Sequence, residues 1–383
     1  MIGDYWKAVA TLVGIIIGAG VLGIPYVVAQ SGWILGTIII VVVGVSFIFL
    51  NLYMGEIVLR TKEIHQLSGY IVRYLGQKGK LAMAFSMIVG IYGALIAYLI
   101  GEGQTLSALL PFSIPPLMYT ILFFAITSFI VWRGVKSAGT AELVFIIVML
   151  AVIGIIIGAI LPGMNVSYLM QFNIDNVLMP LGVIIFAFIS SAAVPEMHEL
   201  LIKKKKLYKK ALITGSIVPI ILYTLFSAAV IGVVGLDNFE AMSPNDRIAT
   251  IALAQHSFPV LGTFANIFAV LAMFTSYIGL AVGLTEMYEY DFKWKRKYAL
   301  LATLGVPLIF VLLDLSSFIT VIAVTGGIAG GIDGILIVLA YWKARLGGDR
   351  RPEFKVKSPL WISYVVLALF MFALLQQIAL LII

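Results

Sequence analysis

Apolar stretches of about the length of a membrane helix follow one another along almost the whole chain. Because lipid offers no partner for backbone N–H and C=O groups, such stretches are stable in a bilayer as α-helices. A helix needs about 20 mostly apolar residues to cross the hydrocarbon core. By this measure the sequence predicts eleven transmembrane helices, at 5–30, 33–59, 81–109, 116–132, 137–161, 177–201, 209–235, 259–289, 297–313, 316–341 and 358–381.

The composition indicates the same class of protein. Of the 383 residues, 62% are hydrophobic and 11% are charged, whereas a soluble domain carries about 25% charged residues. A soluble protein this apolar would expose large sticky patches and aggregate. The chain is therefore predicted to be an all-α integral membrane protein, a single transmembrane domain over 1–383, with the lipid bilayer as its surroundings.

The positions of the basic residues predict the orientation of these helices. Cytoplasmic connections of membrane proteins carry an excess of Lys and Arg. With the N-terminus inside, every basic residue except Arg247 falls on the cytoplasmic side. The sequence thus predicts a multi-pass protein of the cell membrane, with the N-terminus inside and the C-terminus outside. In the outer connection 237–258, Ser243 and Pro244 predict the start of a short helix.

The first predicted span contains a stretch that a continuous helix tolerates poorly. Residues 14–25 include four glycines and a proline, with Gly18, Ala19 and Gly20 at the centre. Unpaired backbone inside a bilayer is tolerated only where protein or a water-filled cavity satisfies it. We therefore predict a helix that is broken near the middle of the membrane.

A second interruption falls in the sixth predicted span, at Ser190 and Ser191. Paired breaks in corresponding parts of two halves are the best sequence indication of a transporter binding site. A single small-residue motif would instead indicate close helix packing. The predicted topology places the two broken spans in opposite directions, which favours a 5+5 inverted repeat. The repeats are expected at 1–161 and 177–341, with an added helix at 358–381.

A broken helix exposes the groups that can bind a zwitterion. Its free N–H end carries partial positive charge and suits a carboxylate, while its free C=O end suits an ammonium group or a metal cation. No arginine lies in the core of any predicted span, in keeping with a site built from backbone. The predicted substrate-binding residues are Ile17, Gly18, Ala19, Gly20, Val21, Tyr98, Phe186, Ile189, Ser190 and Ser191.

One acidic residue lies close to the expected site. Glu102 follows Tyr98 by four residues, so the two share a face of the third helix. An acid inside a span is costly and indicates function. Glu102 is interpreted either as a carrier of a coupling proton, or a partner of a substrate amine, or as a solvated group near the outer mouth.

Other charged residues are interpreted as gate candidates. Glu142 and Asp333 fall in the cytoplasmic halves of their spans and are expected to be gate or packing partners. Lys7 is expected to pair with Glu286 or Glu289 and to close the cytoplasmic mouth.

Three spans together resemble a known family. The first span reads GAGVLGIPY at 18–26 and QSGW at 30–33, and it is similar to the first helix of amino acid permeases in the amino acid–polyamine–organocation superfamily. The nearest resemblance is to the amino acid/auxin permease branch and its bacterial aromatic and hydroxy amino acid relatives. The motifs at 186–188, 194–196 and 275–280 also fit that branch. The resemblance implies a LeuT-type fold that works by alternating access.

The resemblance also implies a place for a coupling cation. In Na⁺-coupled members of the fold, one carbonyl and two hydroxyls of helix eight meet two carbonyls of helix one. The matching positions here are Ala272, Thr275 and Ser276 with Gly14 and Ile17. Oxygen ligands suit a hard cation, although the most similar permeases are thought to be proton-driven. The alternative for the two hydroxyls is bonding within their own helix. Na⁺ is slightly favoured over H⁺.

These patterns predict a cation-coupled symporter of neutral amino acids, aromatic ones included. The alternatives are an amino-acid-binding membrane sensor and a transporter of another small solute on the same fold. No enzyme activity, cofactor other than the coupling ion, nucleic acid or protein partner is implied. The chain has no cysteine, and its histidines, His65, His198 and His256, fall in loops or at span ends.

Overall fold

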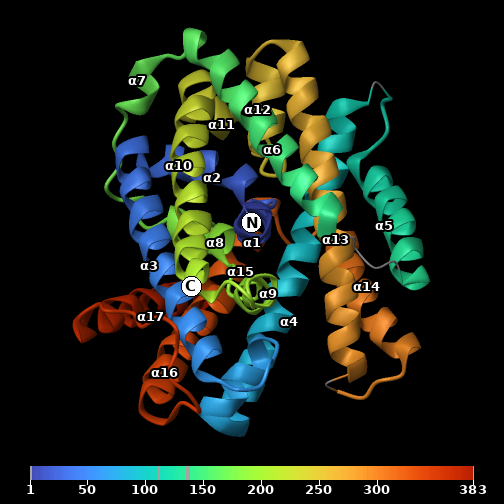
Figure 1. The fold of residues 1–383 in the computed structure, drawn as a ribbon. Coiled ribbons are helices and arrows are strands. Elements are labelled where there is room, and N and C mark those ends of the chain that lie inside the picture. Colours follow the sequence, from blue (N-terminus) through green and yellow to red (C-terminus); the bar gives the residue numbers. More distant parts are fainter. Residues whose placement is uncertain (1, 111, 135–138, 291, 383) are drawn as a thin grey trace.

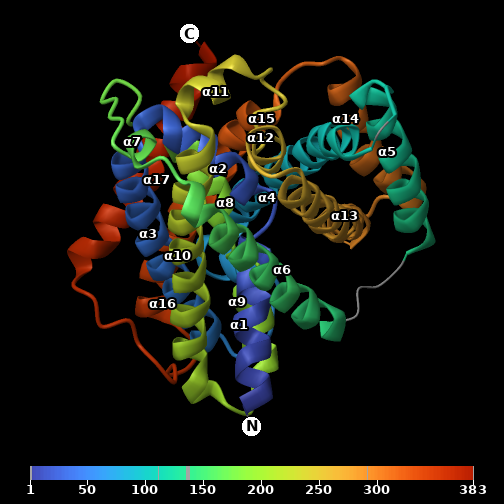
Figure 2. The ribbon, with the colours of Figure 1, turned by 90° about the horizontal axis from the view of Figure 1, so that it is seen from above.

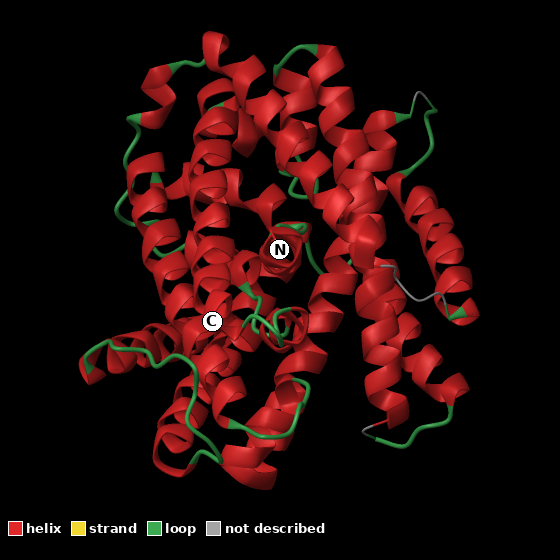
Figure 3. Cartoon of the chain, viewed as in Figure 1, coloured by secondary structure: helices red, strands yellow, loops and turns green. Residues whose placement is uncertain are grey.

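The computed structural model describes residues 2–110, 112–134, 139–290 and 292–382, with side chains for 3–110, 112–134, 146–290 and 292–382. Over these residues the chain consists of helices joined by loops, as Figure 3 shows. Nine of the described helices are long and apolar enough to cross a membrane, and one bent pair brings the number to ten.

The predicted spans correspond to eleven helical segments. They are α1 (Ile2–Ile16) with α2 (Gly20–Ser31), α3 (Trp33–Arg60), α4 (Leu67–Leu109), α5 (Pro116–Arg133), α6 (Gly139–Ile160), α8 (Pro180–Phe188) with α9 (Ala193–Leu200), α10 (Tyr208–Val234), α13 (Pro259–Tyr290), α14 (Arg296–Leu312), α15 (Phe318–Thr325) with the π-helical η3 (Gly326–Gly330) and α16 (Gly331–Gly347), and α17 (Leu360–Ile382). Because α14 has only 17 residues, the count of eleven membrane spans stays a prediction.

The third span begins earlier than the sequence predicts. It was expected at 81–109, but α4 starts at Leu67 and runs across a non-helical residue, Gly76, whose φ is 70°. Arg73 precedes Gly76, and Gln77, Lys78 and Lys80 follow it, so no unbroken apolar stretch runs from Leu67 to the predicted span. Glycine adopts this positive φ without the steric cost that a side chain would add.

Both predicted breaks are present. The helix axis turns by 56° between α1 and α2, across residues 17–19. Figure 1 looks almost along α1, whereas α3 and α10 run up the page, and Figure 2 shows α1 lengthwise. The second break separates α8 from α9 at residues 189–192. The first and sixth spans are therefore discontinuous, while the division into inverted repeats remains a prediction.

The two termini lie at opposite ends of the helix bundle, as Figure 2 shows. Near the N-terminus, Asp4 pairs with Lys204 at 2.5 Å, in the Lys-rich connection 203–207. We call this the basic end. Which end faces the cytoplasm stays a prediction from the charge pattern.

Short helices fill the connections. They are η1 (Leu161–Gly163), α7 (Val166–Leu169), η2 (Lys205–Leu207), α11 (Leu236–Ala241) and α12 (Ala249–His256). The predicted helix start at Pro244 is wrong, because α12 begins at Ala249. Residues 243–246 form a turn instead, in which the N–H of Asp246 donates to the carbonyl of Ser243. The side chain of Arg247 binds the carbonyls of Phe239, Glu240 and Met242 around the end of α11.

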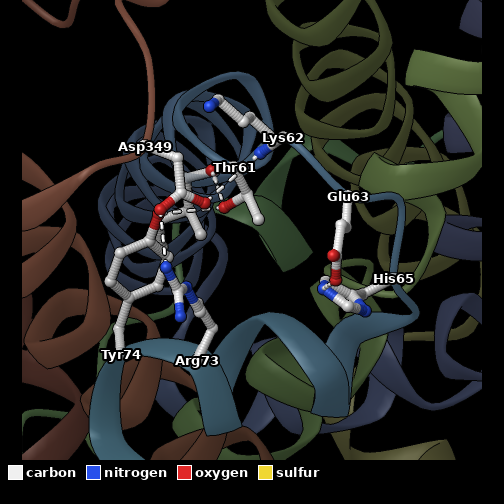
Figure 4. A network of polar contacts seen from close by, with 8 residues as sticks. Thr61, Lys62, Glu63, His65, Arg73, Tyr74 and Asp349 are labelled. Carbon is white, nitrogen blue, oxygen red and sulfur yellow. Dashed lines mark hydrogen bonds and ion pairs between the residues drawn. The ribbon is translucent and has the colours of Figure 1, made fainter.

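At the basic end, the segment between α16 and α17 is tied to the connection between α3 and α4. Asp349 accepts a hydrogen bond from Arg73 at 2.6 Å and one from the N–H of Lys62, as Figure 4 shows. Deeper in, the buried Glu56 binds Arg60 and the N–H of Val356. These contacts fix the start of α17 relative to α3.

Candidate functional site

The two broken helices cross in direct contact. A Cβ atom placed on Gly20, the first residue of α2, would lie 2.7 Å from the Cα atom of Ala187 near the end of α8. Real Cβ atoms do not approach another backbone so closely, so only glycine fits at this crossing. The glycine that marks the break in the sequence therefore also lets the two broken spans meet.

One side chain joins both breaks. Tyr223 of α10 is fully buried, and its hydroxyl donates toward the carbonyl of Ile16 at 2.7 Å and that of Ala187 at 3.0 Å. Ile16 is the last residue of α1, where helix carbonyls lose their intrahelical partners. Tyr223 thus satisfies backbone groups that the breaks release.

A small cavity lies beside the first break. Its walls are Ile17, Gly18, Ala19, Val21 and Leu22 from the first span and Phe268, Ala269, Ala272 and Met273 from α13. Its volume is about 10 Å³, close to the smallest space that holds one water molecule. No charged side chain lines it, so binding there depends on backbone dipoles and apolar contact. An amino acid would need this space to widen.

Tyr98 connects three spans at this place. Its hydroxyl on α4 interacts with the side chain of Ser276 on α13 and with the backbone of Ala19 in the first break. A Cβ on Gly18 would lie 3.3 Å from the same hydroxyl. The structure therefore brings predicted residues from the first, third and eighth spans together.

The serines of the second break are buried. Ser190 Oγ accepts a hydrogen bond from Asn51 on α3 at 3.1 Å, and Asn51 also binds Ser216 on α10. Ser191 is 2% exposed. The side chain of Ser190 is thus engaged in holding α8, α3 and α10 together. Of the remaining predicted residues, Phe186 and Ile189 are partly buried.

The residues of the implied cation site have different surroundings. Ile17 and Ala272 line the same cavity. Thr275 is exposed, and its hydroxyl binds the carbonyls of Leu271 and Ala272 in its own helix. Gly14 is partly exposed two residues before the end of α1.

The acidic candidates also differ in their partners. Glu102 is 0% exposed, and neither of its carboxyl oxygens has a hydrogen-bond partner in the described part of the chain. Asp333 is buried and binds Ser86 of α4 at 2.6 Å. Glu289 pairs with Arg296 at 3.3 Å, and Lys7 is exposed. The side chain of Glu142 lies outside the described residues.

Sequence reasoning did not find Tyr223, Asn51, Phe268 and Met273. Each lies inside a long helix and away from the two breaks, with Tyr223 on α10, Asn51 on α3, and Phe268 and Met273 on α13. Tyr223 and Asn51 carry a hydrogen-bonding group inside a predicted span, and this signal could have pointed to them. Among the described residues, no group of three or more His, Asp or Glu side chains is arranged to hold a metal ion.

A comparison with known families places the chain. The model of the tryptophan/tyrosine permease family matches residues 1–377. The chain belongs to this family. It is therefore a multi-pass permease of the cell membrane and not an enzyme, in the aromatic amino acid branch of the amino acid–polyamine–organocation superfamily, as its first-span motif indicates.

Relatives of this permease have amino acids in their names. It is 26% identical to tyrosine-specific transport system 1 of Haemophilus influenzae, covering 93% of this chain and 92% of that protein. It is 25% identical to glutamine transporter 2 of Aliivibrio fischeri, covering 82% of both.

A solved structure shares the fold of this permease. The structure of MhsT in complex with L-phenylalanine matches with a TM-score of 0.66 over 98% of this chain and 97% of that one, at 14% identity. This likeness confirms an all-α membrane fold of the LeuT type.

Proposed function

We propose that this permease is a secondary active transporter that carries neutral amino acids, aromatic ones included, together with a cation. The crossing of the two broken spans at Gly20 and Ala187 is the observation that supports it most. Near this crossing α2 and α9 begin and α1 and α8 end, so helix ends of both polarities lie close together. Such a pair of charges of opposite sign suits the carboxylate and ammonium groups of one amino acid. Tyr223 binds the carbonyls of Ile16 and Ala187, and the substrate uses the other backbone groups of these ends.

A neutral substrate side chain is favoured by the lining of the cavity. Phe268, Met273 and Leu22 are apolar, and a charged side chain placed against them would lose its hydration without gaining a partner. The names of the tyrosine and glutamine relatives and the L-phenylalanine bound to MhsT agree with a neutral substrate.

The coupling cation is proposed to be Na⁺ or H⁺. Na⁺ would use carbonyls of Gly14, Ile17 and Ala272 with the hydroxyls of Thr275 and Ser276. The cavity shared by Ile17 and Ala272 supports that set. The intrahelical bonds of the Thr275 hydroxyl and its exposure favour H⁺ instead. By the charge pattern, the basic end faces the cytoplasm.

Uptake by purified protein in proteoliposomes tests this proposal. Labelled amino acids are screened while the Na⁺ gradient and the pH gradient are varied separately. We expect concentrative uptake of neutral amino acids under one of the two gradients and none in protein-free vesicles. If Na⁺ drives it, Thr275→Ala with Ser276→Ala should abolish the dependence on Na⁺.

Two results would contradict the proposal. Binding of an amino acid without any uptake or exchange would indicate a membrane sensor. Uptake of a solute other than an amino acid, with no amino acid transported, would indicate a different cargo on the same fold.

A further inference from the structure

The carboxyl group of Glu102 is enclosed without a partner. It lies in the half of α4 away from the basic end, is 0% exposed, and has no hydrogen bond at either oxygen in the described part of the chain. An isolated carboxylate in such surroundings costs several kcal/mol and is rarely found ionised. We therefore infer that the carboxyl group carries a proton, and is neutral, in this conformation.

The helix is tightly packed at the residues on both sides of Glu102. A Cβ on Gly101 would lie 2.9 Å from the sulfur of Met273 and 3.2 Å from the ring of Phe318. A Cβ on Gly103 would overlap the hydroxyl of Thr120 on α5. The Glu102 carboxyl group has no hydrogen-bonding oxygen beside it in the described part of the chain. A hard metal cation requires several oxygen ligands, whereas a proton needs one carboxyl oxygen only.

In the residues that the structure describes, no charged side chain hydrogen bonds to Glu102. The helices packed on α4 near this position are α5, α12, α13 and α15, and α15 has no titratable side chain. The titratable side chains on the others, and the nearest one on α4, are Tyr119, Arg133, His256, Tyr277, Glu286, Tyr288, Glu289, Tyr290 and Tyr98. None of them hydrogen bonds to Glu102.

The register between α4 and α13 shows what lies beyond Glu102. Tyr98 contacts Ser276, and Gly101 contacts Met273, so the two helices are antiparallel and their facing residue numbers change in opposite directions. Thr105, three residues after Glu102 on α4, is therefore opposite Ala269 on α13. Asn266 precedes Ala269 by three residues and shares its helix face.

The register between α12 and α13 shows which residue of α12 lies next to Asn266. A Cβ on Gly262 of α13 would overlap the backbone of Ala254 on α12, and only residues 257–258 join the two helices, so they form an antiparallel pair. Thr250 lies four residues before Ala254 on α12, and Asn266 lies four residues after Gly262 on α13. Each is about one helical turn from that contact, so Thr250 is opposite Asn266. The hydroxyls of Thr105 and Thr250 and the amide oxygen of Asn266 are also buried without a hydrogen-bond partner among the described residues. Unsatisfied groups therefore continue from Glu102 away from the basic end.

We propose that Glu102 is the group that binds the coupling proton, reached along Thr105, Asn266 and Thr250. This inference rests on the proposed transport of amino acids. The Glu102 carboxylate takes one proton from water on the outer side and becomes a neutral carboxylic acid. It returns that proton to water on the cytoplasmic side, so one positive charge enters with each neutral amino acid. Tyr98, one helical turn from Glu102 on α4, interacts with the backbone of Ala19 in the first break.

Proton movement in Na⁺-free proteoliposomes tests the assignment. The vesicles contain the full chain and a trapped pH-sensitive dye, and receive L-tyrosine, or the amino acid with the highest uptake in the screen above. The wild type should acidify the lumen, and a pH gradient of about one unit should concentrate the substrate about tenfold. Glu102→Gln should keep substrate exchange, with an accumulation ratio near one and no acidification. The exposed Glu240 provides the matched control, Glu240→Gln, which should behave as the wild type.

The outcomes separate this inference from the proposed function. Exchange without acidification in the wild type, or unchanged acidification in Glu102→Gln, overturns the role of Glu102 and leaves transport intact. No exchange in the wild type overturns the proposed function itself. If Glu102→Gln does not fold, Glu102→Asp decides by infrared spectroscopy. The band of a protonated carboxylic acid should shift between wild type and Glu102→Asp, and an unshifted band refutes the assignment.

Discussion

The hydroxyl oxygen of Tyr223 lies 2.7 Å from the carbonyl oxygen of Ile16, at the point where α1 ends. The same hydroxyl is 3.0 Å from the carbonyl of Ala187 in the sixth span. Tyr223→Phe leaves both carbonyls without this donor while the ring stays in place. An unsatisfied buried group costs about 1–3 kcal/mol, so we expect lower thermal stability and weaker substrate binding.

The measurement is a comparison of unfolding temperature and of the half-saturation concentration for uptake. Tyr119→Phe is the control, because its hydroxyl binds the carbonyl of Phe112, away from both breaks. Equal effects of the two substitutions would show that Tyr223 does not hold the breaks together.

Gly20→Ala is expected to abolish uptake while the protein still reaches the membrane. The added Cβ would meet the Ala187 backbone at 2.7 Å, and backbone cannot move aside as a flexible side chain can. Gly3→Ala is the matched control, since a Cβ there has nothing within 4 Å. Uptake and membrane abundance are measured together, and normal uptake by Gly20→Ala would remove the crossing from the site.

The Asn51 amide is expected to couple energetically to Ser190. Asn51→Leu removes its bonds to Ser190 and Ser216 and should destabilise the protein by about 1–3 kcal/mol. A double-mutant cycle with Ser190→Ala measures the interaction, which should be about 0.5–3 kcal/mol for residues in one hydrogen-bond network. Additive effects would mean that Asn51 does not hold the second break.

Asp349 is expected to contribute a pH-dependent term to stability. The Arg73 guanidinium, hydrogen bonded to Asp349, holds the pKa of that carboxyl below its usual range. A carboxyl whose pKa is lower when folded stabilises the protein above its unfolded pKa of about 3.9. That contribution is lost as the pH falls through the folded pKa. The stability difference between wild type and Asp349→Asn should therefore be present near neutral pH and shrink in acid, and a constant difference would contradict the ion pair.

The sequence by itself determined the class of fold and the location of the breaks. Apolar stretches in lipid must be helical because their backbone groups have no other partner, and this requirement is independent of how helices pack. Glycine at 18 and 20 and serine at 190 and 191 interrupt two spans for local reasons of backbone conformation. The first-span motif is also local, and the family resemblance that it carries is confirmed by the match to the tryptophan/tyrosine permease family.

Only the tertiary structure decided which side chains serve those breaks. Tyr223, Asn51 and Met273 lie inside long helices away from the breaks, and their roles follow from contacts between segments far apart in the chain. The same holds for Thr275, whose hydroxyl binds its own helix. It also holds for Glu102, whose carboxyl group has no hydrogen-bond partner among the described residues because of how the helices around it pack. Local pattern fixes where backbone groups become free, whereas the packing of helices decides what they meet.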